Sequence, residues 1–299
     1  MPIISHISMT MITYIQRTAL AGCFLFLLLA CQNSAAPGDQ LPEQPRGSLF
    51  IIGGGSRPPE MIRDLCHLAM GDDSGTIFIF TQASAEPDTS FYYAALQFRK
   101  EGYDRVRHVY QGAGQETESA LLDSIRRGAL LYLAGGDQSR FMERVDGTPL
   151  YDALKDAYVN GAVIAGTSAG AAVMSEVMIT GDQKRVPEYT GDFRTIEADN
   201  MILAKGMGFL DSAVIDQHFI RRMRFNRLLS VVLENPELTG FGIDESTALF
   251  VEGHRGRVFG EGQVLVVRTH PGSVRTERGL LGARDIRLDL LLQGDTIHW

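Results

Sequence analysis

The sequence predicts an α/β fold built on a doubly wound, mostly parallel sheet, with antiparallel hairpins at its C-terminal end. Short β-branched runs alternate with longer helical patterns from residue 48 to about residue 166, which is the order of right-handed βαβ units. Runs such as IFIF (77–80) and AVIA (162–165) are apolar on both faces, as strands buried in a parallel sheet are. With 299 residues, of which 44% are hydrophobic, the chain can bury such a core.

The expected elements follow one another in a regular order. The strands are the apolar runs at 48–52, 76–80, 106–110, 129–133 and 161–166. The helices are the segments with helical patterns at about 58–69, 90–101, 116–127, 138–145 and 150–158. Next, VIDQHF (214–219) leads into a helix that ends near Glu234, and three glycine-containing hairpins follow at 240–253, 255–268 and 285–299. We expect these hairpins to extend one edge of the sheet.

Residues 1–30 have the pattern of a lipoprotein signal peptide. Arg17 precedes an apolar segment that is shorter than the ~20 residues of a membrane-spanning helix. The segment ends in Leu28-Leu29-Ala30-Cys31, which resembles the bacterial lipobox, whose cysteine is lipidated after cleavage in front of it. A plain signal peptide with an incidental cysteine is the alternative.

Residues 31–47 are rich in Gln, Pro, Ser and Gly, a composition that does not fold by itself. We therefore expect a flexible tether, followed by one folded domain over residues 48–299. Lipid on Cys31 would hold this exported domain at a membrane, in the periplasm or on the cell surface. The net charge of −8 argues against nucleic acid as a partner, because phosphate neutralisation needs clustered Lys and Arg.

Ser168 is the first candidate for chemistry. It stands in GTSAG (166–170), where an expected strand becomes a helix. A serine on such a turn exposes its hydroxyl, and the flanking glycines remove side chains that would clash. The free N–H groups at the start of the following helix would suit an oxyanion. The same pattern is also compatible with a serine that only caps a helix in a tight turn.

His218 could activate such a serine, because a nucleophilic serine needs a neutral imidazole within hydrogen-bond reach. It follows an expected strand in Asp216-Gln217-His218-Phe219, the same strand-end position that Ser168 has, and strand ends converge at the sites of doubly wound sheets.

An arginine cluster comes directly after His218, in the expected first turns of a helix, where cations oppose the helix dipole. A solvated basic face is one interpretation, and a site for substrate carboxylates is the other. The cluster consists of Arg221, Arg222, Arg224 and Arg227.

Four segments carry a specific combination of motifs: AGGDQ (134–138), AGTSAGAAVM (165–174), VIDQHFIRRMRFNRLL (214–229) and GIDESTAL (242–249). In this combination the chain resembles the serine peptidases of the peptidase E (aspartyl dipeptidase) and cyanophycinase type. The resemblance implies a sheet of the class I glutamine amidotransferase type, and members of the family are commonly homodimers. No cofactor is implied, and no His/Cys cluster of the sequence has the spacing of metal ligands.

The resemblance also implies a role for each matching residue. Ser168 would be the nucleophile, His218 its base, and the backbone amides of Gly136 and Ala169 the oxyanion hole. The residues that would line the substrate pocket, as in the cyanophycinase branch, are Gln138, Asp216, Gln217, Arg222, Arg224 and Arg227.

The third member of the triad departs from the family pattern. The resemblance implies a glutamate about eighteen residues after the serine, a position that Val186 occupies in this chain. We place the acid at Glu188, with Glu197 as the rival, since a carboxylate on a loop can rotate to meet the second imidazole nitrogen.

The expected activity is hydrolysis of β-aspartyl bonds in cyanophycin (multi-L-arginyl-poly-L-aspartate) or related isoaspartyl peptides. The arginines would hold substrate carboxylates, and Asp216 would receive a substrate guanidinium. One alternative is an α/β-hydrolase esterase, which shares the G-x-S-x-G pattern, although no HGGG-type motif is visible. The other is a surface-tethered binding module that kept the pocket and lost turnover.

Overall fold

A computed structural model describes residues 45–71, 75–112, 115–186, 188 and 193–299 of the chain. These residues belong to one compact unit. The expected signal peptide (1–30), Cys31 and nearly all of the expected tether (31–47) lie outside the described residues. No helix within the described part is both long enough and apolar enough to cross a membrane.

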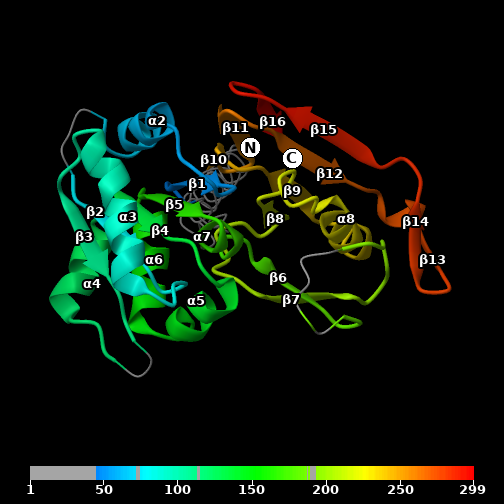
Figure 1. The fold of residues 1–299 in the computed structure, drawn as a ribbon, viewed down its shortest axis with the longest axis horizontal. Helices are drawn as coiled ribbons and strands as arrows, with labels where there is room; N and C mark the ends of the chain where they lie inside the picture. Colours follow the sequence, from blue (N-terminus) through cyan, green and yellow to red (C-terminus); the bar gives the residue numbers. More distant parts are fainter. Residues whose placement is uncertain (1–44, 72–74, 113–114, 187, 189–192) are drawn as a thin grey trace, which may run out of the picture. The chain divides into compact units, whose positions relative to one another are not determined.

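The larger of two main sheets has eight strands in the order β16-β11-β10-β1-β5-β4-β2-β3 (Figure 1). The strands from β1 to β3 in this order are mutually parallel, whereas β10, β11 and β16 extend the β1 edge in antiparallel fashion. The mostly parallel sheet with antiparallel strands from the C-terminal part of the chain is thus confirmed. The bounds are β1 Ser48–Ile52, β2 Ile77–Phe80, β3 Val106–Val109, β4 Leu130–Leu133, β5 Val163–Thr167, β10 Thr247–Glu252, β11 Arg255–Gly260 and β16 Thr296–His298.

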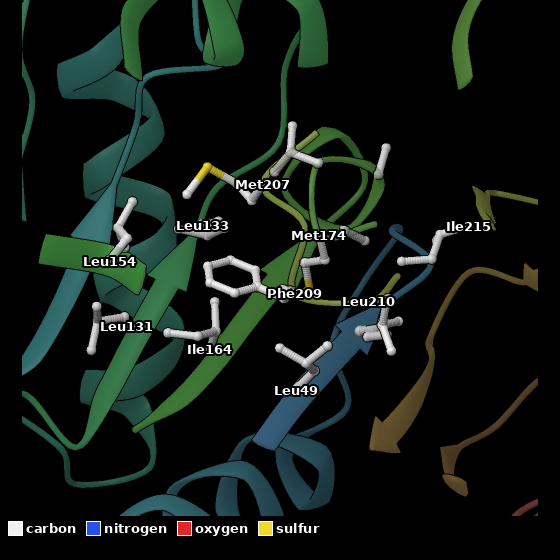
Figure 2. Close-up of a cluster of buried hydrophobic side chains, with 14 of the residues drawn as sticks. Leu49, Leu131, Leu133, Leu154, Ile164, Met174, Met207, Phe209, Leu210 and Ile215 are labelled. Atoms are coloured by element: carbon white, nitrogen blue, oxygen red, sulfur yellow. The ribbon is translucent and has the colours of Figure 1, made fainter. Parts of the chain in front are cut away.

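Helices cover both faces of this sheet, because its central strands are apolar on both sides. On β1, Leu49 and Ile51 join one core with residues of α4, α5 and α6, whereas Phe50 and Ile52 join a second core with residues of α2 and α3. Figure 2 shows part of the first core, where Leu154 of α6 lies over the strands. The helices are α2 Pro59–Met70, α3 Pro87–Lys100, α4 Ser119–Arg126, α5 Gln138–Val145 and α6 Pro149–Val159.

A second sheet of four strands, in the order β15-β12-β9-β8, corrects the expected arrangement of the hairpins. Only β10, β11 and β16 extend the large sheet, because the chain passes between the two sheets within each expected hairpin, from β9 to β10, from β11 to β12 and from β15 to β16. Helix α8 packs on this second sheet through a third core. The elements are β8 Ala213–Gln217, α8 Phe225–Glu234, β9 Thr239–Ile243, β12 Val264–Arg268 and β15 Arg287–Leu291.

Two smaller ribbons complete the described chain. One is the antiparallel pair β6–β7 and the other is the hairpin β13–β14. Their bounds are β6 Val177–Gln183, β7 Met201–Lys205, β13 Val274–Glu277 and β14 Leu280–Ala283.

Candidate active site

Ser168 lies on a strained turn directly after β5. Its backbone has φ 54° and ψ −116°, a conformation that is costly for a residue with a side chain and typical of a nucleophile elbow. The side chain makes no capping hydrogen bond to α7 (Ala169–Ala172). The serine is therefore not a helix cap, which was one of the two interpretations of the motif.

The expected helix after Ser168 is shorter than the sequence suggests. It has four residues, so its dipole is small. Any stabilisation of an oxyanion has to come from individual N–H groups at this turn.

His218 connects Ser168 to a carboxylate. Its Nε2 lies 2.8 Å from Ser168 Oγ, and its Nδ1 lies 2.6 Å from Glu245 Oε1. The backbone N–H of His218 donates to Gly53 O at 2.7 Å, which ties the end of β8 to the end of β1. The ring packs so closely on Gly54 that a Cβ there would meet it at 2.3 Å, and Gly54 has φ +114°, so this position requires glycine.

The carboxylate beside His218 corrects the sequence-based choice of acid. Glu188 is exposed, and Glu197 Oε2 pairs with Arg185 Nη1 at 3.2 Å. Both glutamates belong to the segment that connects β6 to β7. Glu245 instead occupies the β9–β10 connection that joins the two sheets, and the ends of β5 and β8 meet there.

A signal in the sequence could have identified Glu245. It lies in GIDESTAL, two residues after the end of β9 at Ile243. The strand-end rule that singled out Ser168 and His218 applies to it equally.

Burial lowers the pKa of His218 below its ordinary value. The hydrogen bond that His218 Nδ1–H donates to Glu245 opposes this effect, and the positive charges of Arg222 and Arg224 add to it. The imidazole is therefore neutral at neutral pH and can accept a proton from Ser168.

Two backbone N–H groups beside Ser168 are free to bind an oxyanion. The N–H groups of Ala169 and Gly136 have no hydrogen-bond partner among the described residues, and Ala169 is completely buried. Buried N–H groups in proteins are almost always paired. The loop that carries Gly136 is fixed by a hydrogen bond from Asp137 N to Ala83 O at 2.9 Å.

A cavity of ≈390 Å³ opens on one side of Ser168. We call it the arginine cavity, because three guanidinium groups line it together with Gly136, Gln138 and Gln217. Arg222 is exposed, whereas the other two arginines are buried. Of the six residues expected to line one pocket, the structure brings together five around this cavity, namely Gln138, Gln217 and the three arginines. The arginines are Arg222, Arg224 and Arg227.

Asp216 does not face this cavity, which corrects another expectation. Its carboxylate is fully buried and accepts two hydrogen bonds from Arg227, one of them 2.6 Å long from Nε to Oδ2. Arg224 Nη1 lies 3.7 Å from the same carboxylate. Because its acceptors are used internally, Asp216 is not available to a substrate guanidinium.

Gln217 and Gln138 also make internal hydrogen bonds. Arg224 Nη1 donates to the backbone oxygen of Gln217 at 2.6 Å and to its side-chain oxygen. Gln138 Nε2 donates to Ile179 O at 3.0 Å and Thr180 O at 2.6 Å, so it anchors α5 to β6 at the rim of the cavity.

The helix after His218 begins later than expected. Residues 219–224 form turns, and α8 starts at Phe225. Arg221 and Arg222 therefore precede the helix, where their side chains are exposed.

A second cavity, of ≈280 Å³, opens on the other side of Ser168. We call it the tyrosine cavity, since Tyr93 and Tyr132 line it together with Arg57, Thr167 and His218. No sequence motif predicted this cavity. Within the described part of the chain, no group of three or more His, Cys, Asp or Glu residues could hold a metal ion.

The site combines a serine on a nucleophile elbow with a histidine and a glutamate in one hydrogen-bonded chain, next to free N–H groups. This combination defines the class of serine hydrolases. Residues 49–259 match the protein family described as Peptidase family S51. The chain belongs to this family and is a serine peptidase.

Two proteins similar to this chain agree with the family, and one solved structure has a similar fold. Cyanophycinase of Synechococcus elongatus is 32% identical over 262 residues, which cover 84% of this chain and 78% of the relative. Cyanophycinase of Nostoc sp. is 30% identical over 268 residues, with 86% and 87% covered. The crystal structure of a peptidase from an acI-B1 Actinobacterium has a similar fold, with a TM-score of 0.61 at 18% identity, and the match covers 86% of this chain and 98% of that one.

Proposed function

We propose that the protein hydrolyses β-aspartyl bonds in cyanophycin, multi-L-arginyl-poly-L-aspartate, or in isoaspartyl peptides related to it. The observation that carries this proposal is the hydrogen-bonded chain Ser168–His218–Glu245 beside the arginine cavity. The relatives named cyanophycinase support the substrate class.

In the proposed reaction, His218 Nε2 accepts the proton of Ser168 Oγ, and the serine oxygen attacks the substrate carbonyl carbon. The N–H groups of Gly136 and Ala169 stabilise the oxyanion that forms. The imidazolium returns the proton to the leaving amine, and Glu245 stabilises the positive charge on the ring meanwhile. Water, activated by His218 in the same way, then releases the acyl group.

Electrostatics favours an acidic acyl group in the arginine cavity. Three arginines line the cavity, and the buried Asp216 pairs with Arg227 from the interior. Asp137 and Asp182 also line the cavity, but both are exposed, so solvent screens their charge. Guanidinium groups bind carboxylates in bidentate geometry. Arg222 is the most accessible of the three, so we assign it the direct contact, with Arg224 and Arg227 supplying the positive potential.

The test is hydrolysis of cyanophycin and of β-aspartyl-arginine by the purified domain, starting at about residue 47. Ser168→Ala is expected to lower kcat by about 10³-fold or more, and a serine-directed phosphonate should label wild-type Ser168. Ser124→Ala is the matched control, because Ser124 lies on α4 and its hydroxyl bonds Ala120 O. Full activity of Ser168→Ala would show that the proposed mechanism is wrong.

The two alternative functions have less support. If the protein were an α/β-hydrolase esterase, the arginine cavity would have no role in binding the substrate. Comparing the rates of hydrolysis of a simple acyl ester and a β-aspartyl peptide tests this alternative. A binding module without turnover would not need an activated serine. Tight binding of β-Asp-Arg without cleavage would favour that alternative.

We also propose that the chain is an exported lipoprotein held at a membrane through lipid on Cys31, that it is a homodimer, and that its sheet is of the class I glutamine amidotransferase type. The support for the anchor is the Leu28–Cys31 motif. Cys31→Ser should abolish incorporation of labelled fatty acid in a bacterial host. Sedimentation of the purified domain measures its oligomeric state.

A further inference from the structure

The two cavities beside Ser168 differ in the catalytic groups that line them. The arginine cavity is lined by Gly136 but not by His218, whereas the tyrosine cavity is lined by His218 but not by Gly136. Ser168 lines both. A substrate whose carbonyl carbon is at Ser168 can therefore extend to both sides.

The position of the base indicates which part of the substrate each cavity holds. In acyl transfer to serine, the base that deprotonates the hydroxyl later protonates the leaving amine. The leaving amine must therefore lie on the side of His218, which is the side of the tyrosine cavity. The acyl group then lies on the side of the arginine cavity.

The tyrosine cavity is rich in unused hydrogen-bond donors. The hydroxyls of Tyr132 and Thr167 are buried and have no hydrogen-bond partner among the described residues, and these two residues are 1% and 6% exposed. Leaving a buried hydroxyl unsatisfied is costly, so native proteins rarely leave one without a ligand or water. Among the described residues, no aspartate or glutamate lines this cavity.

Arg57 adds a fixed positive charge to these donors. Its Nε donates to Gln97 Oε1 at 2.6 Å, and its Nη1 donates to Gly55 O at 2.7 Å. Its Nη2 has no hydrogen-bond partner within the described part of the chain. The guanidinium is held in place before a ligand arrives, which reduces the entropic cost of binding.

We propose that the tyrosine cavity is the leaving-group subsite, and that it binds the free α-carboxylate of the amino acid whose amine is released. Arg57 pairs with this carboxylate, and the hydroxyls of Tyr132 and Thr167 donate hydrogen bonds to it. This inference rests on the proposed function of Ser168 and His218. It makes the enzyme selective for a scissile bond that precedes a C-terminal residue.

The test compares β-aspartyl-leucine with β-aspartyl-leucinamide, which differ only in the charge at the leaving-group end. The wild-type enzyme should prefer the acid by about tenfold or more in kcat/KM, since hydrogen bonds to a charged group are stronger than those to a neutral one. Arg57→Gln should bring the ratio close to one, and Arg57→Lys should keep part of it. Thr167→Val and Tyr132→Phe should each lower it severalfold.

Arg63→Gln is the matched control, because Arg63 lies on α2 and pairs with Glu60 and Glu101 rather than lining the cavity. The ratio of the two substrates cancels a general loss of activity from a disturbed Gly55 loop. Equal rates for the acid and the amide in the wild type, or an unchanged ratio in Arg57→Gln, would overturn the inference. Cleavage of neither substrate, together with no phosphonate labelling of Ser168, would overturn the proposed function and the inference with it.

Discussion

At the residue scale, the activity of Ser168 depends on which carboxylate faces His218 Nδ1. We predict that Glu245→Gln lowers kcat by about 10²–10⁴-fold, because the imidazole loses the group that fixes its tautomer and stabilises its positive charge. Glu188→Gln and Glu197→Gln should stay close to wild type, since Glu188 is exposed and Glu197 pairs with Arg185. Steady-state kinetics on β-aspartyl-arginine measures all three variants.

The melting temperature of each variant serves as the control for folding. A large loss of kcat in Glu188→Gln with Glu245→Gln unaffected would restore the sequence-based choice of acid.

The pH profile tests the environment of His218. Because burial lowers its pKa from 6.5, and because the neutral ring is the active form, the acid limb of kcat/KM should lie below pH 6.5. The positive charge of Arg222 contributes to the lowering, so Arg222→Gln should move the limb to higher pH.

The measured quantity is the pH at the midpoint of the acid limb and not the maximal kcat/KM, because Arg222 also lines the substrate cavity and its loss can lower kcat/KM by itself. A limb that stays in place or moves to lower pH in this variant would contradict the assignment.

The residues that could be predicted from the sequence are those that stand at strand ends with a specific chemistry. Ser168 and His218 are 50 positions apart, yet the structure places them in hydrogen-bond contact. The role expected of Asp216 was wrong, because the sequence does not show which arginine of the folded chain forms an ion pair with its carboxylate. Arg227 reaches it from the first turn of α8, 11 residues further along the chain.

At the element scale, the buried ion pair between α8 and β8 connects the second sheet to the active site. We predict that Asp216→Asn lowers the free energy of unfolding by about 3–5 kcal/mol, because it leaves the buried Arg227 without its counter-charge. The double variant Asp216→Leu/Arg227→Met should recover most of this loss. Urea unfolding followed by circular dichroism measures both.

If Asp216→Asn instead left stability unchanged and weakened only the binding of arginine-containing substrates, Asp216 would face the substrate after all. Arg255→Gln is a suitable comparison, because Arg255 is an exposed residue on β11.

Elements of the parallel sheet could be predicted well, and α5 spans the predicted residues 138–145. Their patterns are local: buried strands, amphipathic helices and Thr148 or Asp137 as N-caps. The split into two sheets could not be predicted, since a hairpin pattern gives the turn but not the sheet that its strands join. Strand pairing over long sequence separation decides this, as between β1 and β10.

At the scale of the whole molecule, the active site lies where two sheets meet, so contacts between the sheets should matter for stability. Trp299 follows β16 of the large sheet, and its ring packs edge-to-face on Phe241 of β9 in the second sheet, with centroids 4.8 Å apart. Phe241 is completely buried. The last residue of the chain thus connects both sheets, far in sequence from Ser168.

We predict that Trp299→Ala lowers the free energy of unfolding by about 2–3 kcal/mol, somewhat less than the 3–5 kcal/mol of a fully buried aromatic residue, because Trp299 is only half-buried. Since it is the chain's single tryptophan, circular dichroism rather than fluorescence must follow unfolding of the variant. His254→Ala is the matched control, because the His254 ring also contacts Trp299 but with a longer distance of 6.0 Å between the ring centroids. This variant should lower the free energy of unfolding less than Trp299→Ala. An unchanged melting temperature in Trp299→Ala would mean that the two sheets are held together by the chain connections between them and by the rest of the buried core.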